Sequence, residues 1–145
     1  MRILIMTDSP LMPTGLGRVG RELALGLTKR GHQIGYIGWF HLQGTKDRVD
    51  GIDLWTTNNG YYGADIFDSI VMRFRPDIVL TVGDMWNLAY FLDPMACKTR
   101  KLFQWCAYIP VDGEPSGGGL PPGIIPIINE VDIPVAYTEY AKNAI

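Results

Sequence analysis

The first forty residues contain a strand, a glycine-rich turn, a helix and a second strand in direct succession. Residues 2–7 form a nearly continuous apolar run, which is typical of a buried parallel strand. A helix is predicted over about 17–30, where Gly31 ends it, and residues 34–38 form the next strand. The apolar face expected for this helix consists of Val19, Leu23 and Leu27. A strand–helix–strand unit has a right-handed crossover, so the chain is expected to build a parallel sheet.

The same alternation continues through most of the chain. Further strands are predicted at 53–56, 78–82, 102–108 and 133–137. Helices are predicted at 66–74 and at 87–97, the second interrupted by Pro94, and Thr138 is expected to cap a helix that begins at Glu139. This order predicts a Rossmann-like α/β fold with three layers, in which helices cover both faces of a mainly parallel sheet. The length of 145 residues suits one domain, residues 1–145.

The turn at 13–18 is the first candidate site. Glycines let a ligand approach the backbone closely, and the start of the following helix offers free N–H groups and the positive end of its dipole. Gly15, Leu16, Gly17 and Arg18 are therefore candidates for contact with a phosphate or diphosphate. The alternative is that the glycines only allow the helix to pack closely on the strand.

Residues 15–20 also match the dinucleotide pattern G-x-G-x-x-G. However, the preceding turn is long, and the second strand ends at Gly38-Trp39 without the carboxylate that would bind a ribose. The pattern alone is therefore weak evidence for an NAD enzyme, which stays an alternative.

Ligands of such sheets bind beyond the carboxyl ends of the strands, so the loops at these ends supply the remaining candidates. Carboxylates there can accept hydrogen bonds from sugar hydroxyls, and aromatic rings can stack on a sugar or base. The candidate residues for an acceptor or cleft site are Asp84, Tyr108, Asp112, Gly113, Glu114, Thr138 and Glu139.

Composition and charge exclude several classes of function. The formal net charge of -2 gives no electrostatic reason to expect nucleic acid. No apolar run reaches the roughly 20 residues that span a bilayer. Cys97 and Cys106 have no metal-ligand spacing and are expected to be reduced thiols in a cytoplasmic protein. No metal site and no catalytic triad are predicted.

Three segments in order resemble one enzyme family. The first is the opening strand with its turn Pro13-Thr14-Gly15-Leu16-Gly17-Arg18, and the second is Tyr108-Ile109-Pro110-Val111-Asp112-Gly113-Glu114. The third is the strand end and helix start Val135-Ala136-Tyr137-Thr138-Glu139-Tyr140-Ala141-Lys142, where Thr138 stands in place of the family's serine. Together they are similar to the N-terminal domain of group 1 (family 4) glycosyltransferases.

The resemblance implies a retaining transferase of the GT-B type, with two Rossmann-like domains and a catalytic cleft between them. In that family the N-terminal domain mainly holds the acceptor, and the C-terminal domain holds most of the nucleotide-sugar donor. The glycine turn, here Gly15 to Arg18, lies close to the donor diphosphate, and no metal cofactor is usually needed.

The paired-glutamate motif of the family's C-terminal half is not in these 145 residues. The chain is therefore expected to be the acceptor-side domain, inactive alone, with a donor domain supplied in cis or in trans. Two alternatives remain: a non-catalytic domain that binds saccharide or protein, and a nucleotide-binding domain of oxidoreductase type.

Overall fold

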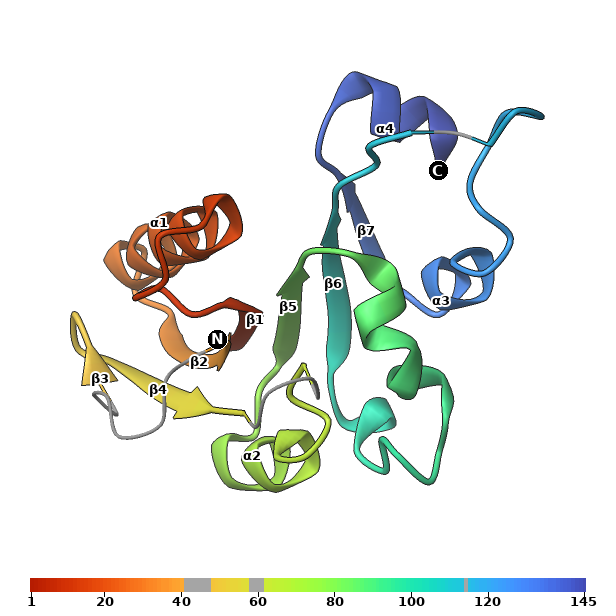
Figure 1. Ribbon diagram of the computed structural model, residues 1–145. Coiled ribbons are helices and arrows are strands. Elements are labelled where there is room, and N and C mark those ends of the chain that lie inside the picture. The colour runs from red at the N-terminus through yellow and green to blue at the C-terminus, as the bar shows by residue number, and fades with distance from the viewer. Residues whose placement is uncertain (41–47, 58–61, 114) are drawn as a thin grey trace.

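The computed structural model describes residues 1–40, 48–57, 62–113 and 115–145. It is a three-layer α/β fold of Rossmann type, as the sequence predicts, built on a seven-stranded sheet of order β3-β4-β2-β1-β5-β6-β7 (Figure 1). All neighbouring strands are parallel except β3 and β4, which pair antiparallel. The strands are β1 (Arg2–Asp8), β2 (Gln33–Trp39), β3 (Arg48–Val49), β4 (Ile52–Thr56), β5 (Ile78–Val82), β6 (Gln104–Ile109) and β7 (Ile133–Ala136). The helices are α1 (Gly15–Lys29), α2 (Phe67–Phe74), α3 (Ile125–Asn129) and α4 (Glu139–Ala144), with 3₁₀ helices η1 (Met85–Leu92) and η2 (Arg100–Leu102).

The strand order reverses at the centre of the sheet. From β1 the chain moves outward to β2 and β4, and then returns across the sheet to place β5 on the other side of β1. The loops that follow β1 and β5 therefore leave the sheet next to each other and turn to opposite sides. In open sheets of this kind, ligands bind at such a switch point, beyond the carboxyl ends of the strands.

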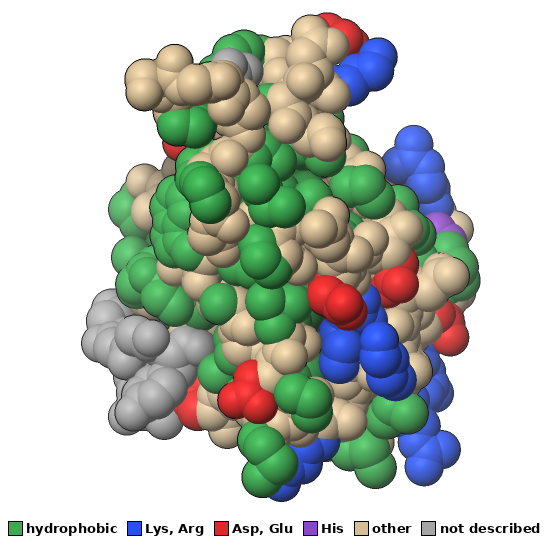
Figure 2. Space-filling view, turned by 90° about the vertical axis from the view of Figure 1, so that its right-hand side faces the viewer, with side chains coloured by type: hydrophobic (Ala, Val, Ile, Leu, Met, Phe, Trp, Pro, Cys, Tyr) green, Lys and Arg blue, Asp and Glu red, His purple; other side chains and the backbone are tan. Residues whose placement is uncertain are grey.

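The core has two layers, one on each face of the sheet. Side chains of α2, η1 and α3 pack on one face, around Met6, Trp39 and Trp105. On the other face α1 covers β1, β2 and β4, around Ile5 and Tyr36. Figure 1 shows α1 on one side of the sheet and α2 on the other. Figure 2 shows hydrophobic side chains spread over the middle of the side of the molecule that bears β7 and α3.

Helix α1 differs from the prediction at its start and on its buried face. It begins at Gly15, two residues earlier than expected, because Thr14 caps it. Its buried residues are Gly17, Gly20 and Ala24, whereas the predicted apolar face of Val19, Leu23 and Leu27 is only half-buried. Small residues bring this helix close to the sheet: a Cβ on Gly20 would lie 2.1 Å from Tyr36 Oη.

The end of α1 is as predicted. Gly31 takes a left-handed conformation with φ of 83°. Its N–H donates to the Thr28 carbonyl, and the N–H of His32 donates to that of Leu27. These two bonds form the Schellman arrangement that ends a helix at glycine.

Two segments between the strands differ from the prediction. The helix expected at 87–97 is a 3₁₀ helix that starts at Met85 and ends at Leu92, because Pro94 holds Asp93 in an extended conformation. Helix α3 was not predicted, since five residues are too few for a periodic pattern; its Pro126 lies in the first turn, where proline is tolerated. In the described part of the chain, no helix has the length and apolar character needed to cross a membrane.

Candidate functional site

A cavity of about 370 Å³ lies at the carboxyl edge of the sheet, next to the switch point. We call it the strand-end cavity. Loops that follow β5, β6 and β7 and the first turn of α1 form its walls. Its lining residues are Leu16, Asp84, Pro110, Val111, Asp112, Tyr137 and Thr138. Four predicted site residues are thus brought together here: Leu16, Asp84, Asp112 and Thr138.

The first turn of α1 is held in place by a chain of hydrogen bonds from β1. Thr14 Oγ1 donates to Asp8 Oδ2 at 2.6 Å and accepts from the N–H of Gly17 at 3.0 Å. Asp8 is the last residue of β1, so the strand fixes the cap and the cap fixes the helix start. An N-cap of this kind satisfies one of the N–H groups that a helix leaves free at its start.

Gly17 does not act as the turn that the sequence predicted. It is buried in the first turn of α1, and a Cβ there would lie 2.7 Å from the Ser9 carbonyl oxygen and 3.0 Å from that of Met12. With its N–H bound to Thr14, Gly17 has the packing role that was the alternative interpretation. The predicted glycine turn over 13–18 is therefore wrong for its second part, because the residues from Gly15 onward belong to α1.

Gly15, Leu16 and Arg18 point to different sides of the helix start. A Cβ on Gly15 would meet no atom within 4 Å, so its backbone is open to a ligand. Gly15 and Arg18 line a second hollow of about 520 Å³, beside the residues of the β1–α1 loop, which we call the helix-start hollow. Leu16 lines the strand-end cavity instead. The predicted phosphate group of residues is thus divided between two adjacent hollows.

The charges of the two hollows differ. Arg18 has no ion-pair partner among the described residues, whereas Arg21 is held 2.8 Å from the carboxylate of Asp50. The free N–H group of Gly15 and the Arg18 guanidinium favour an anion at the helix-start hollow, which Glu22 also lines. Two carboxylates, Asp84 and Asp112, line the strand-end cavity.

The pKa of Asp84 reflects this acidic environment. Partial burial raises the pKa of its carboxyl group above the ordinary value, and the negative charges of Asp112 and Asp8 raise it further. Like charges around a cavity disfavour a phosphate and favour a neutral ligand whose hydroxyl groups donate hydrogen bonds.

Three other predicted residues do not line the cavity. Tyr108 lies on the α1 side of the sheet and stacks on Tyr137 at 4.6 Å between ring centroids, with an interplanar angle of 22°. Gly113 is exposed in the loop after the lining residue Asp112. Glu139 is exposed in the first turn of α4 and lies 3.5 Å from Lys142. Glu114 lies outside the described residues.

Thr138 caps α4 as predicted, and it also lines the cavity. Its Oγ1 accepts a hydrogen bond from the N–H of Ala141 at 3.1 Å. The hydroxyl proton of a capping threonine remains available to donate to a ligand.

Pro110 and Val111 line the cavity from a loop that sequence reasoning selected without naming them as candidates, and Tyr137 was missed. Tyr137 directly follows β7, at the position from which ligand-binding loops start, so its place at the strand end was the available signal. Among the described residues no group of three or more His, Cys, Asp or Glu side chains could hold a metal ion.

The end of β2 bears on dinucleotide binding. Its last residue is Trp39, which is buried, and the indole rests against Gly83 after β5. No carboxylate stands at this position to bind a ribose, as the sequence indicates.

Comparison with known proteins gives little further information. No protein-family model matches the chain, and no curated protein matches it. Among solved structures, the chain is similar to the Bordetella bronchiseptica enzyme WbmH in complex with NAD+, with a TM-score of 0.46 and 13% sequence identity. The match covers 74% of this chain and 38% of that one, so this chain spans well under half of the WbmH chain.

Proposed function

We propose that this chain is the acceptor-side domain of a retaining glycosyltransferase of the GT-B type. The sequence motifs around Gly15, Asp112 and Thr138 motivate the proposal. The observation that supports it is the strand-end cavity, where Asp84, Asp112 and Thr138 from three separate loops line one small hollow. The activity requires a second Rossmann-like domain, in cis or in trans, that binds the nucleotide sugar.

In this proposal the strand-end cavity binds the acceptor. Hydroxyl groups of a saccharide donate to the carboxylates of Asp84 and Asp112, and the Tyr137 ring offers an apolar face to the sugar. Asp84 and Asp112 repel the donor phosphates from the cavity. The donor diphosphate then lies toward the helix-start hollow, where Gly15 N–H and Arg18 can bind it.

The proposal is tested by sugar transfer. The chain is mixed with, or fused to, the C-terminal domain of a group 1 glycosyltransferase, and transfer from common nucleotide sugars to a panel of saccharides is measured. Asp112→Asn is expected to lower transfer about 10- to 100-fold, as for the loss of one or two hydrogen bonds to a charged group.

Glu130→Gln is the matched control, because it removes one exposed carboxylate that lies near Lys101 and lines neither hollow. It should leave the rate unchanged. Activity that survives both Asp112→Asn and Gly15→Val undiminished would remove the assigned site. Saccharide binding without turnover in every reconstitution would favour a binding domain over an enzyme.

The dinucleotide-binding alternative has one observation in its favour, since Gly20 lets α1 pack closely on β1 as the third glycine of that pattern does. The second glycine of the pattern should be open to the pyrophosphate, but Gly17 is buried and its N–H is bound to Thr14. NMR titration of the labelled chain with NAD(H) and NADP(H) distinguishes the two functions, and the proposal expects no response from Gly15, Leu16 or Gly17.

A further inference from the structure

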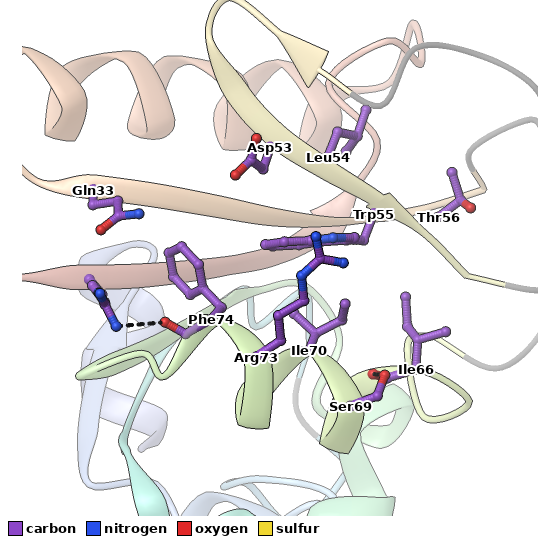
Figure 3. A pocket seen from close by; sticks show the side chains of 11 residues that line it. Gln33, Asp53, Leu54, Trp55, Thr56, Ile66, Ser69, Ile70, Arg73 and Phe74 are labelled. Carbon is purple, nitrogen blue, oxygen red and sulfur yellow. Dashed lines mark hydrogen bonds between the residues drawn. The ribbon is translucent and has the colours of Figure 1, made fainter.

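A second cavity, of about 580 Å³, lies on the opposite side of the sheet from α1, between β4 and α2. We call it the edge groove. Its volume is in the range of small-molecule sites. Figure 3 shows side chains from both elements pointing into it, Trp55 from β4 and Arg73 from α2, whereas Thr56 points to the other face of β4. None of its lining residues lines the strand-end cavity.

An indole ring with a fixed position lies in this groove. Trp55 packs against β2 where Gly35 has no side chain, since a Cβ on Gly35 would lie 2.7 Å from Trp55 Cζ3 and 3.0 Å from Cη2. The Phe74 ring meets it edge-on at 5.7 Å between centroids. The backbone of β2 and one neighbouring ring thus hold the indole, and its remaining surface lines the cavity. A fixed, partly exposed indole is a platform on which a flat ring can stack.

The charge of the groove favours an anion. Arg73 extends from the last turn of α2 toward Trp55 (Figure 3), and it has no ion-pair partner among the described residues. Arg2 lies at the other end and donates one hydrogen bond to the Phe74 carbonyl at 3.3 Å, which leaves other donors of its guanidinium free. The one lining carboxylate, Asp53, is compensated by Arg48, whose Nε lies 3.4 Å from it.

We propose that the edge groove binds an anionic ligand with a flat ring, of the size and chemistry of a nucleoside monophosphate. The ring stacks on Trp55, and the phosphate accepts hydrogen bonds from Arg73, while Arg2 adds positive charge at the other end of the groove. Gln33 and Ser69 also line the groove, and the Ser69 hydroxyl, which donates to the Ile66 carbonyl, can still accept a hydrogen bond. This site is separate from the strand-end cavity and does not depend on the function proposed for it.

The test is a titration of the isotope-labelled chain with adenosine 5′-monophosphate, followed by NMR. We expect the indole N–H signal of Trp55 to shift, with saturation below about 10 mM. Inorganic phosphate and adenosine, titrated separately, should each bind at least about tenfold more weakly, because each lacks one of the two interactions.

Two variants of equal charge change complete the test. Arg73→Gln should weaken binding about tenfold or more, and Lys29→Gln, which removes a cation from the last turn of α1, should have no effect. Arg73 is exposed, so its replacement leaves the fold intact. The proposal is overturned if Trp55 does not respond, if phosphate alone binds as tightly as the nucleotide, or if Arg73→Gln binds like the wild type. A response confined to Leu16, Asp84 and Asp112 would likewise overturn it and would place the nucleotide at the other site.

Discussion

The two glycines at the start of α1 have different physical roles. Gly17 is buried against the carbonyl oxygens of Ser9 and Met12, whereas Gly15 faces open space. A pattern of glycines in a sequence does not separate these roles, because both packing and ligand approach require a missing side chain.

Alanine substitution distinguishes the packing role of Gly17 from the open position of Gly15. Gly17→Ala should lower the free energy of unfolding by about 1–3 kcal/mol, because the new Cβ forces the β1–α1 loop away. Gly15→Ala should leave it unchanged or raise it slightly, because alanine has the higher helix propensity and the space is empty. Urea unfolding of both variants measures the difference, and equal stability of the two would contradict this assignment.

Asp84 links the acidity of the strand-end cavity to stability. Its pKa in the folded chain is raised, first by burial and then by Asp112 and Asp8, so the ionised carboxylate destabilises the fold. The stabilising effect of its protonated form is fully present below the unfolded pKa and is lost as pH rises through the folded pKa.

Asp84→Asn should therefore raise the free energy of unfolding at pH 7, by no more than about 1 kcal/mol because the group is only partly buried and solvent screens its charge. The gain should vanish below about pH 3, where the wild-type carboxyl is also neutral. Asp112→Asn should lower the pKa of Asp84 toward its ordinary value in an NMR titration. A loss of stability in Asp84→Asn of equal size at both pH values would show that the side chain is held by hydrogen bonds instead.

At the scale of elements, the joint between η2, β6 and β7 depends on a buried guanidinium. Arg100 is 8% exposed and lies over the rings of Phe103 and Trp105 at 5.5 and 5.4 Å from their centroids. It donates to the Glu130 carbonyl and to Asp132 Oδ2, and that carboxylate also accepts from the Trp105 N–H at 2.7 Å. The Asp132 carboxylate, directly before β7, thus connects η2, β6 and β7 through its bonds to Arg100 and Trp105.

Asp132→Asn should lower the free energy of unfolding by about 1–3 kcal/mol at pH 7, since Arg100 and Trp105 lose a charged acceptor. Burial opposes ionisation of Asp132, but its bonds from Trp105 and Arg100 outweigh burial and hold the pKa below its ordinary value. The contribution of Asp132 to stability is therefore present above its pKa in the unfolded chain, and it is lost as pH falls through its pKa in the folded chain. Urea unfolding at pH 7 and at low pH measures it, with Glu130→Gln as control; an effect that does not decrease in acid would contradict the role of the charge.

Local patterns predicted most elements but not how they face one another. The apolar runs predicted the main strands. Gly31 predicted the end of α1, and Thr138 predicted the start of α4. The buried face of α1 was missed, because the stripe through Gly17, Gly20 and Ala24 has less hydrophobicity than the one through Leu23 and Leu27. Which of these two stripes is buried depends on how closely α1 packs on the sheet, and the sequence pattern does not contain that distance.

At the scale of the whole molecule, the candidate site is a consequence of strand order. Asp84 and Asp112 follow the adjacent strands β5 and β6, so the rule for strand ends correctly predicted that they lie together. Tyr108 was misplaced because it is still inside β6, where alternation directs its side chain to the face of the sheet. The edge groove was not predicted at all, since it depends on how α2 packs beside β4.

The two halves of the sheet are covered unequally on the α1 side. Helix α1 packs over β1, β2 and β4, whereas β7 presents Ile133 and Val135, each 39% exposed, beside the half-buried Tyr108. The strand-end cavity opens at the border between these halves, where Leu16 of α1 and Tyr137 after β7 both line it. A ligand bound there would contact both halves at once.

The most direct test of the central claim is an NMR titration of the labelled chain with a panel of saccharides and uridine diphosphate glucose. The account predicts that at least one saccharide shifts the backbone signals of Leu16, Asp84, Asp112 and Thr138 together, with one dissociation constant, that Asp112→Asn weakens this response, and that uridine diphosphate glucose does not shift the four signals as a group. If these four signals never move as a group, or move only with NAD+, the strand-end cavity is not an acceptor site.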